Sequence, residues 1–209
     1  MMKQINRPLA TVSCWLVFAP ISAHAVVFIE QADVFTPDQL ANPVAAETYY
    51  GELTDWPHTF TFTVREEVPV RYTLATAPDS EPVSLLLVRE VQRGVEEVVR
   101  QTADTTTWQP RRDRRLGVAL ATAPALETTL TPGSYKLEVS NAVNQGRYQL
   151  QIGEGSQGGF FTTIADTFAV HDFYGHWVTA LTTWRVLFVL AIFLGATVWF
   201  WRRYRTGYD

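Results

Sequence analysis

The chain of 209 residues is long enough for one domain together with targeting segments. Its composition, 47% hydrophobic and 18% charged, is that of a globular protein and excludes a largely disordered chain. Between residues 26 and 176, twenty acidic residues stand against eleven basic ones. This acidic balance argues against nucleic acid as a partner, because phosphate binding requires a positive field.

The first 25 residues contain the parts of a secretory signal peptide in the right order. A positively charged start is followed by an apolar run from Leu9 to Ala19 and by the small-residue ending Ala23-His24-Ala25. We therefore predict a signal peptide over residues 1–25, cleaved at its end. An uncleaved membrane anchor is the alternative, although the apolar run is short for a span. The single cysteine, Cys14, lies in this segment, so the mature protein is expected to have no disulfide and no thiol nucleophile.

From residue 26 to residue 153 the chain is a succession of short segments in which apolar and polar residues alternate. Clear examples are Thr59 to Val64, Tyr135 to Val139 and Tyr148 to Ile152. This period of two is expected of strands with one buried face, and proline and glycine separate the segments at intervals of about ten residues. We therefore predict an all-β domain over residues 26–153, an antiparallel, jelly-roll-like β-sandwich of about eight strands.

A linker and juxtamembrane segment is predicted over residues 154–180. Its start is rich in glycine, as in flexible linkers. Four apolar residues farther along are expected to form a stripe that lies on a membrane surface: Ile164, Phe168, Trp177 and Leu181.

Residues 181–201 have the composition of a transmembrane helix. Val186 to Trp201 are uncharged and almost wholly apolar, and the residues before them extend the run to about the twenty that a bilayer requires. Aromatic residues mark both ends, and three arginines follow, which favours a cytoplasmic C-terminus. We predict a single-pass membrane protein with a cytoplasmic tail over residues 202–209 and its main domain periplasmic or otherwise extracytoplasmic. A buried core helix is the alternative, but it would leave an aromatic-rich run without a polar face.

No residues in the sequence have the spacing of a catalytic or metal site. His171 and His176 flank Asp172, but residues five apart do not share a helix face and no third ligand is nearby. The serines lie in no nucleophile motif. Glu66-Glu67 and Glu96-Glu97 are adjacent pairs, which point to opposite faces of a strand. We therefore expect no catalytic residue, no metal site and no cofactor.

A basic cluster in the acidic domain is the main candidate for an interaction surface: Arg111, Arg112, Arg114 and Arg115. Such a cluster can bind an anionic polymer, a lipid headgroup or an acidic protein, and a solvated loop is the alternative. Trp56 and Trp108 lie in predicted turns. If exposed they would favour sugar or protein recognition, and if buried they would cap one end of the sandwich.

The last two predicted strands contain the motifs Pro132-Gly-Ser-Tyr135 and Gly146-Arg-Tyr-Gln-Leu150. They resemble the end of the bacterial pre-peptidase C-terminal (PPC) type of β-sandwich, which finishes with a Pro/Ala-Gly-x-Tyr strand and a Gly-x-Tyr-x-Leu strand. Tyr50 to Leu53 and Phe60 to Phe62 are similar to its opening strands, so the resemblance covers about residues 45–153. It implies a jelly-roll-like sandwich with an accessory role. No peptidase accompanies it in this sequence, and no catalytic residues carry over.

The sequence thus predicts a non-enzymatic, membrane-anchored extracytoplasmic binding or interaction module, accessory to other envelope proteins or polymers. A second interpretation is a surface protein whose C-terminal span is a processed sorting signal. A third is a hydrolase whose acidic or histidine residues come together from separate strands.

Overall fold

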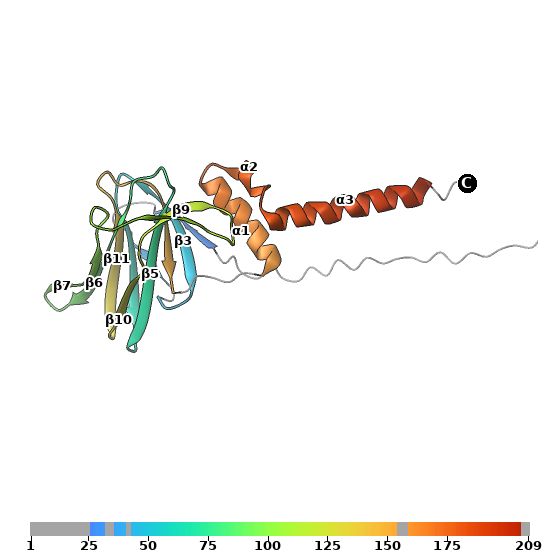
Figure 1. Cartoon of the computed structure of the whole chain (residues 1–209). Helices are drawn as coiled ribbons and strands as arrows, with labels where there is room; N and C mark the ends of the chain where they lie inside the picture. Colours follow the sequence, from blue (N-terminus) through green and yellow to red (C-terminus); the bar gives the residue numbers. More distant parts are fainter. Residues whose placement is uncertain (1–25, 32–35, 41–42, 154–158, 206–209) are drawn as a thin grey trace, which may run out of the picture.

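The computed structural model describes residues 26–31, 36–40, 43–153 and 159–205 of the chain (Figure 1). The predicted signal peptide with Cys14 and the last four residues of the predicted tail lie outside the described residues. The described part contains two β-sheets followed by three helices.

The larger sheet has seven strands: β1 (Val26–Ile29), β3 (Glu47–Thr54), β5 (Val68–Thr76), β8 (Gln109–Arg112), β9 (Ala119–Thr122), β10 (Leu126–Leu130) and β12 (Gln145–Ile152). The smaller sheet has five: β2 (Asp38–Gln39), β4 (His58–Val64), β6 (Ser84–Val91), β7 (Gly94–Gln101) and β11 (Gly133–Ser140). Neighbouring strands are antiparallel except in the pairs β1–β3 and β2–β4, which are parallel. The predicted all-β sandwich is confirmed, but with twelve described strands in place of about eight. Strands of two to four residues, such as β2 and β8, contain too few alternations for the sequence pattern to reveal them.

The two strands with the PPC-like motifs lie at the centre of different sheets. β11 pairs with β4 and β6, whereas β12 pairs with β3 and β5. Their inward-facing residues, among them Tyr135 and Tyr148, are almost fully buried in the core between the sheets. A side chain at Gly51 would begin 2.6 Å from the Tyr148 ring, so the glycine that interrupts β3 provides the space for this tyrosine.

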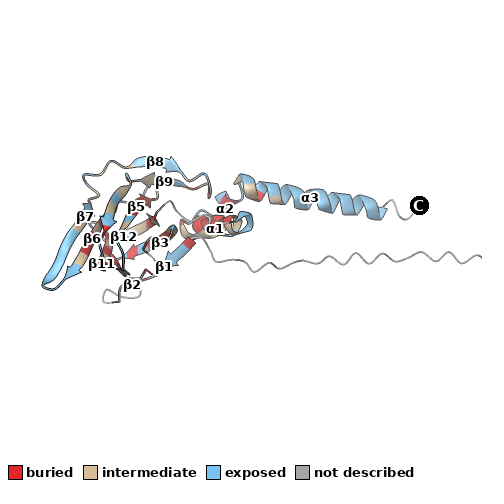
Figure 2. Ribbon diagram, turned by 90° about the horizontal axis from the view of Figure 1, so that it is seen from below, coloured by how far each residue is buried: buried red, intermediate tan, exposed pale blue. Residues whose placement is uncertain are grey.

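A second, smaller core lies on the other face of the seven-stranded sheet. Helix α1 (Phe160–Phe173) packs there, and Val170 and Tyr174 share a buried cluster with Tyr50 of β3 and Leu116 and Leu120 beside β9. Figure 2 shows the buried residues of α1 at this side of the sandwich, whereas in α2 (Trp177–Ala180) only Ala180 is buried. The folded body therefore continues beyond Gly153, and the prediction of a linker and juxtamembrane segment over the whole of residues 154–180 is wrong for residues 160–174.

Helix α3 (Trp184–Arg205) extends away from the sandwich (Figure 1). Within the described residues it is the one helix that is long and apolar enough to span a membrane. Only Val186 among its residues is buried. The helix begins three residues later than the predicted 181 and continues through the arginines of the predicted tail as far as Arg205.

His58 makes the stability of the sandwich sensitive to pH. Its side chain is fully buried, its Nδ1 lies 2.8 Å from the hydroxyl of Tyr148, and its Nε2 has no hydrogen-bond partner among the described residues. Burial disfavours the imidazolium and lowers the pKa of His58 below its usual 6.5. As the pH falls below about 6.5, His58 therefore binds a proton in the unfolded chain but not in the folded chain.

We expect the free energy of unfolding to be independent of His58 above about pH 6.5 and to decrease as the pH falls from there towards the lowered pKa, by about 1.4 kcal/mol for each pH unit between the two pKa values. Urea denaturation in detergent at a series of pH values measures this. The variant His58→Gln should lose this slope, whereas His176→Gln, at an exposed position, should keep it. An equal slope in both variants would contradict the assignment.

Candidate binding groove

A groove lies on the outer face of the seven-stranded sheet. Side chains that point away from the inter-sheet core form its floor, with Gln149 of β12, Ala75 of β5 and Thr122 of β9 aligned across three paired strands. Gln151 and Thr73 form the next row, because they are also register partners. The groove has a volume of about 640 Å³.

The wall of the groove is formed by β8 and the loop after it. β8 pairs with β9 so that Arg111 lies opposite Leu120. The residues of this wall that line the groove are Pro110, Arg111, Arg112, Asp113 and Arg114. Three of the four arginines predicted from the sequence therefore lie together at one site.

The groove is electropositive. Arg111, Arg112 and Arg114 are exposed, and no described residue forms an ion pair or a hydrogen bond with their guanidinium groups. The one carboxylate in the lining, Asp113, accepts hydrogen bonds at Oδ1 from the backbone N–H groups of Arg115 and Leu116, at 2.7 and 3.0 Å. Asp113 thus stabilises the turn and does not pair with an arginine. The three arginines beside the groove are therefore unpaired among the described residues.

Gln149 provides the floor with an unused polar group. Its side chain is 6% exposed, and its Oε1 has no hydrogen-bond partner among the described residues. A buried amide oxygen without a partner is costly, on the order of 1–3 kcal/mol, so Oε1 of Gln149 is available to accept a hydrogen bond from water or from a ligand in the groove. The groove thus combines cations at its rim with amide and hydroxyl groups on its floor.

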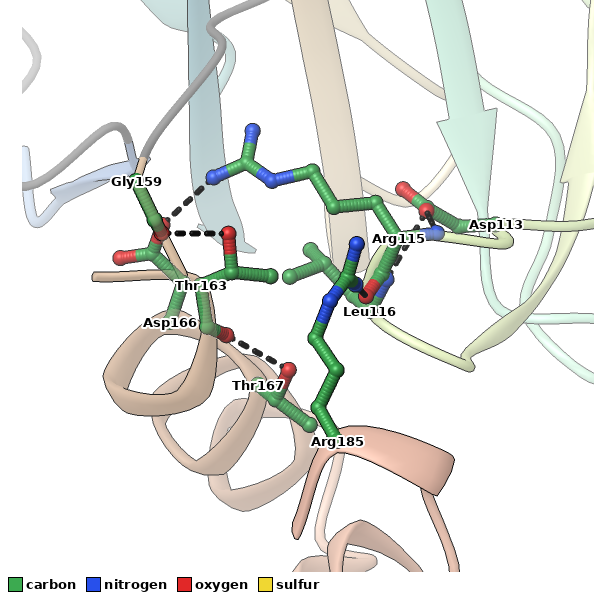
Figure 3. A network of polar contacts seen from close by, with 8 residues as sticks. All are labelled: Asp113, Arg115, Leu116, Gly159, Thr163, Asp166, Thr167 and Arg185. Atoms are coloured by element: carbon green, nitrogen blue, oxygen red, sulfur yellow. Dashed lines mark hydrogen bonds and ion pairs between the residues drawn. The ribbon is translucent and has the colours of Figure 1, made fainter. Parts of the chain in front are cut away.

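Arg115 points away from the groove. Its guanidinium Nη2 lies 2.7 Å from Oδ2 of Asp166 on α1, and the Asp166 carboxylate is almost completely buried (Figure 3). The expectation that Arg115 belongs to the free interaction surface is therefore wrong. Arg114 and Arg115 both lie in the turn after β8, which directs Arg114 to the groove and Arg115 to α1.

Two further contacts connect the Arg115 loop to the helices. The carbonyl of Leu116 accepts a hydrogen bond from Nε2 of His171, at 3.0 Å, and the carbonyl of Arg115 accepts one from Nη1 of Arg185, at 2.6 Å. His171 belongs to α1 and Arg185 to the first turn of α3. One short loop therefore holds both helices against the sandwich (Figure 3).

The predicted tryptophans are not part of the groove. Trp56 and Trp108 are both half-buried, Trp108 packs against the inter-sheet core, and neither lines the groove. Their indole nitrogens are buried without a hydrogen-bond partner among the described residues. The six predicted residues thus divide between the groove, the α1 contact and two separate positions at the core.

Sequence analysis missed the floor of the groove. Thr73, Thr122, Gln149 and Gln151 are the polar residues of alternating strands, a pattern that equally describes a surface facing water. The pattern does not show that β8 folds over them. Elsewhere in the described residues, no three His, Cys, Asp or Glu side chains are grouped so that they could hold a metal ion.

No protein-family model matches the chain, and no curated protein matches it. Several solved structures are similar to it. The PPC domain of a Bacillus anthracis collagenase is 16% identical, covering 61% of this chain and 94% of that one with a TM-score of 0.35. CorA, a surface-associated copper-binding protein of Methylomicrobium album BG8, is 9% identical over 61% of this chain and 96% of that one with a TM-score of 0.28. The CBM35 module of Cellvibrio japonicus Abf62 is 12% identical over 49% of this chain and 71% of that one with a TM-score of 0.24.

The chain contains a β-sandwich of two sheets, and its strand motifs around Tyr135 and Tyr148 resemble those of PPC domains.

The ion pair between Arg115 and Asp166 provides a direct test of how α1 is held. Arg115→Met leaves a buried carboxylate without its guanidinium partner, a change that typically costs about 3–5 kcal/mol. We expect α1 to detach from the sheet, so that its amide hydrogens exchange much faster while those of β11 do not. Hydrogen exchange followed by mass spectrometry measures this.

The matched control is Arg114→Met, which removes an exposed arginine without a partner and should leave exchange in α1 unchanged. The double variant Arg115→Met/Asp166→Leu removes both charges and should restore part of the protection. Equal exchange in the Arg114 and Arg115 variants would show that the ion pair does not hold the helix.

Proposed function

We propose that this protein is a non-enzymatic, membrane-anchored binding module whose sandwich lies on the extracytoplasmic side and binds an anionic polymer of the cell envelope. The observation that carries the proposal is the groove with three unpaired arginines over a polar floor. An acidic partner protein is the alternative ligand, because its carboxylates offer the same charge.

The chemistry of the groove favours an anionic ligand that also has hydroxyl groups. Guanidinium groups form paired hydrogen bonds with carboxylates and phosphates, and the amides of Gln149 and Gln151 can bind hydroxyls. No aromatic residue lines the groove, so it lacks the flat apolar platform on which a neutral sugar ring would stack. An acidic polysaccharide or a phosphate-containing polymer fits these groups.

The lining of the groove supports binding more than hydrolysis. Its single carboxylate, Asp113, is engaged by two backbone N–H groups, and the lining includes no histidine, serine or cysteine. Hydrolysis requires a general acid and a general base, and Asp113 is the only carboxylate in the described lining that could act as either.

Helix α3 supports membrane anchoring. Its residues from Trp184 to Trp201 extend over about 27 Å at 1.5 Å per residue, close to the thickness of the hydrocarbon core of a bilayer. Arg202, Arg203 and Arg205 in its last turns match the positive charge expected on the cytoplasmic side. At the other end, Arg185 turns towards the sandwich and donates to the carbonyl of Arg115, so its charge does not have to enter the apolar layer.

Charge reversal in the groove tests the proposed ligand class. We expect the full-length protein in detergent to bind polygalacturonate in isothermal titration calorimetry and to ignore neutral dextran. The triple variant Arg111→Glu/Arg112→Glu/Arg114→Glu should lose at least tenfold in affinity, because each arginine contributes a charge-assisted contact. Phosphatidylglycerol vesicles and poly-glutamate, used as competitors, distinguish a lipid or an acidic protein from a polysaccharide.

The matched control is Arg65→Glu/Arg93→Glu, which reverses charge at exposed arginines outside the groove. If the control weakens binding as much as the groove variant, the interaction is a general charge effect. If polygalacturonate and both competitors fail to bind, the proposed function is wrong.

The intact mass of the protein from membranes tests anchoring against the sorting-signal interpretation. We expect a mass that corresponds to residues 26–209, with the signal peptide removed and Tyr208-Asp209 retained. The protein should stay with the membrane at alkaline pH. A mass that ends before α3 would show that the span is removed by processing.

A further inference from the structure

Helix α1 buries mostly polar residues, whereas a helix on the surface of a soluble domain buries mostly apolar ones. The face against the sandwich carries Val170 and four polar residues, Thr163, Asp166, Thr167 and His171, all buried. The opposite face carries Phe161, Ala165 and Phe168, of which Phe161 is 78% exposed. In a helix that meets water on its outer side, the apolar residues would face the protein instead.

The buried polar side chains of α1 have hydrogen-bond or ion-pair partners within the protein. Asp166 pairs with Arg115, and His171 donates to the carbonyl of Leu116. The hydroxyls of Thr163 and Thr167 donate to carbonyls one turn earlier in the helix, at 2.9 and 2.7 Å. The buried polar groups of α1 thus have partners within the protein, whereas the outward face leaves the large apolar side chain of Phe161 exposed.

The N-terminal end of α1 lies beside the first turn of α3. The ring centroid of Phe160 is 6.5 Å from that of Trp184 and 6.5 Å from that of Phe188. Phe188 lies four residues, or about 6 Å, farther along α3 than Trp184. Phe160 thus lies beside the part of α3 that is next to the sandwich. The ring centroid of Phe161 lies 5.5 Å from that of Phe160.

We propose that the N-terminal end of α1 is a second membrane contact, in which Phe160 and Phe161 enter the interface of the same bilayer that α3 spans. The inference rests on the proposed anchoring by α3. Lipid is the occupant because the exposed face of Phe161 continues the apolar surface of α3, and tryptophan and other aromatic rings prefer the headgroup region of a bilayer.

This contact fixes the orientation of the sandwich. A single helix would leave the domain free to tilt on the membrane, whereas α3 and the end of α1 are two contacts held by one loop. The other end of the outward face, at the exposed Asp172, is farther along α1 from Phe160 and lies in water. Figure 1 shows α1 inclined to α3, so with α3 across the bilayer α1 would lie at an angle to the membrane with the sandwich attached to it.

Depth measurement by spin labels tests the inference in the full-length chain. Each variant carries Cys14→Ser and one new cysteine, labelled with a nitroxide and reconstituted in phosphatidylcholine vesicles. The test sites are Phe161→Cys, Ala165→Cys and Asp172→Cys. Phe193→Cys, 73% exposed in the middle of α3, is the bilayer reference, and Val95→Cys, 63% exposed on β7 at the far end of the sandwich, is the water reference (Figure 1).

We expect the label at 161 to collide with oxygen severalfold more often, relative to a water-soluble nickel chelate, than the label at 95. The preference for oxygen should decrease from 161 through 165 to 172. If 161 behaves as 95 does while 193 still prefers oxygen, α3 spans the membrane and the second contact is wrong. If 161 is shielded from both reagents, a protein partner covers it and the inference is also wrong.

If the label at 193 meets the nickel chelate as freely as the label at 95, the proposed anchoring itself fails. Ala165→Cys keeps the test valid if the change at 161 disturbs the fold, because residue 165 is exposed on the same face. If the Phe161→Cys variant does not fold, the label at residue 165 decides the test. A label at 165 that prefers the nickel chelate as strongly as the label at 172 does would show that the second contact is wrong.

Discussion

The ion pair between Arg115 and Asp166 is the contact on which the arrangement of the whole chain depends. Asp166 is fully buried, and a carboxylate is stable in such a place only with a close cation. The loop that supplies Arg115 also gives its carbonyls to His171 and Arg185. These three contacts connect α1 and α3 to the sandwich.

The turn after β8 directs neighbouring arginines to two different places. Arg111, Arg112 and Arg114 border the groove, whereas the next residue, Arg115, turns to α1. Asp113 makes this possible because its carboxylate accepts the backbone N–H groups of the turn and keeps it closed. The wall of the groove and the contacts of α1 and α3 with the sandwich therefore depend on one turn of chain.

Helix α1 explains why the boundary of the folded body was placed too early. Its buried face is polar, so the sequence from residue 160 to residue 174 lacks the apolar stripe that identifies a helix packed on a core. Ile164 and Phe168, two residues of the stripe predicted to lie on a membrane surface, are half-buried on a helix that packs on the seven-stranded sheet. These polar residues can be buried because the loop between β8 and β9 provides their partners. A local sequence pattern does not predict that Asp166 pairs with Arg115, 51 residues earlier in the chain.

The sequence by itself determined the sandwich, the apolar helix and the basic cluster, because periodicity, hydropathy and charge are local properties. It also identified β11 and β12 by their tyrosine motifs, although only the strand pairing placed them in different sheets. Tertiary structure decided the rest. Contacts between segments far apart in the chain determine which of the four neighbouring arginines is free, which glutamines line the groove and which face of α1 meets the protein. Such contacts exist only after the two sheets and the helices have packed.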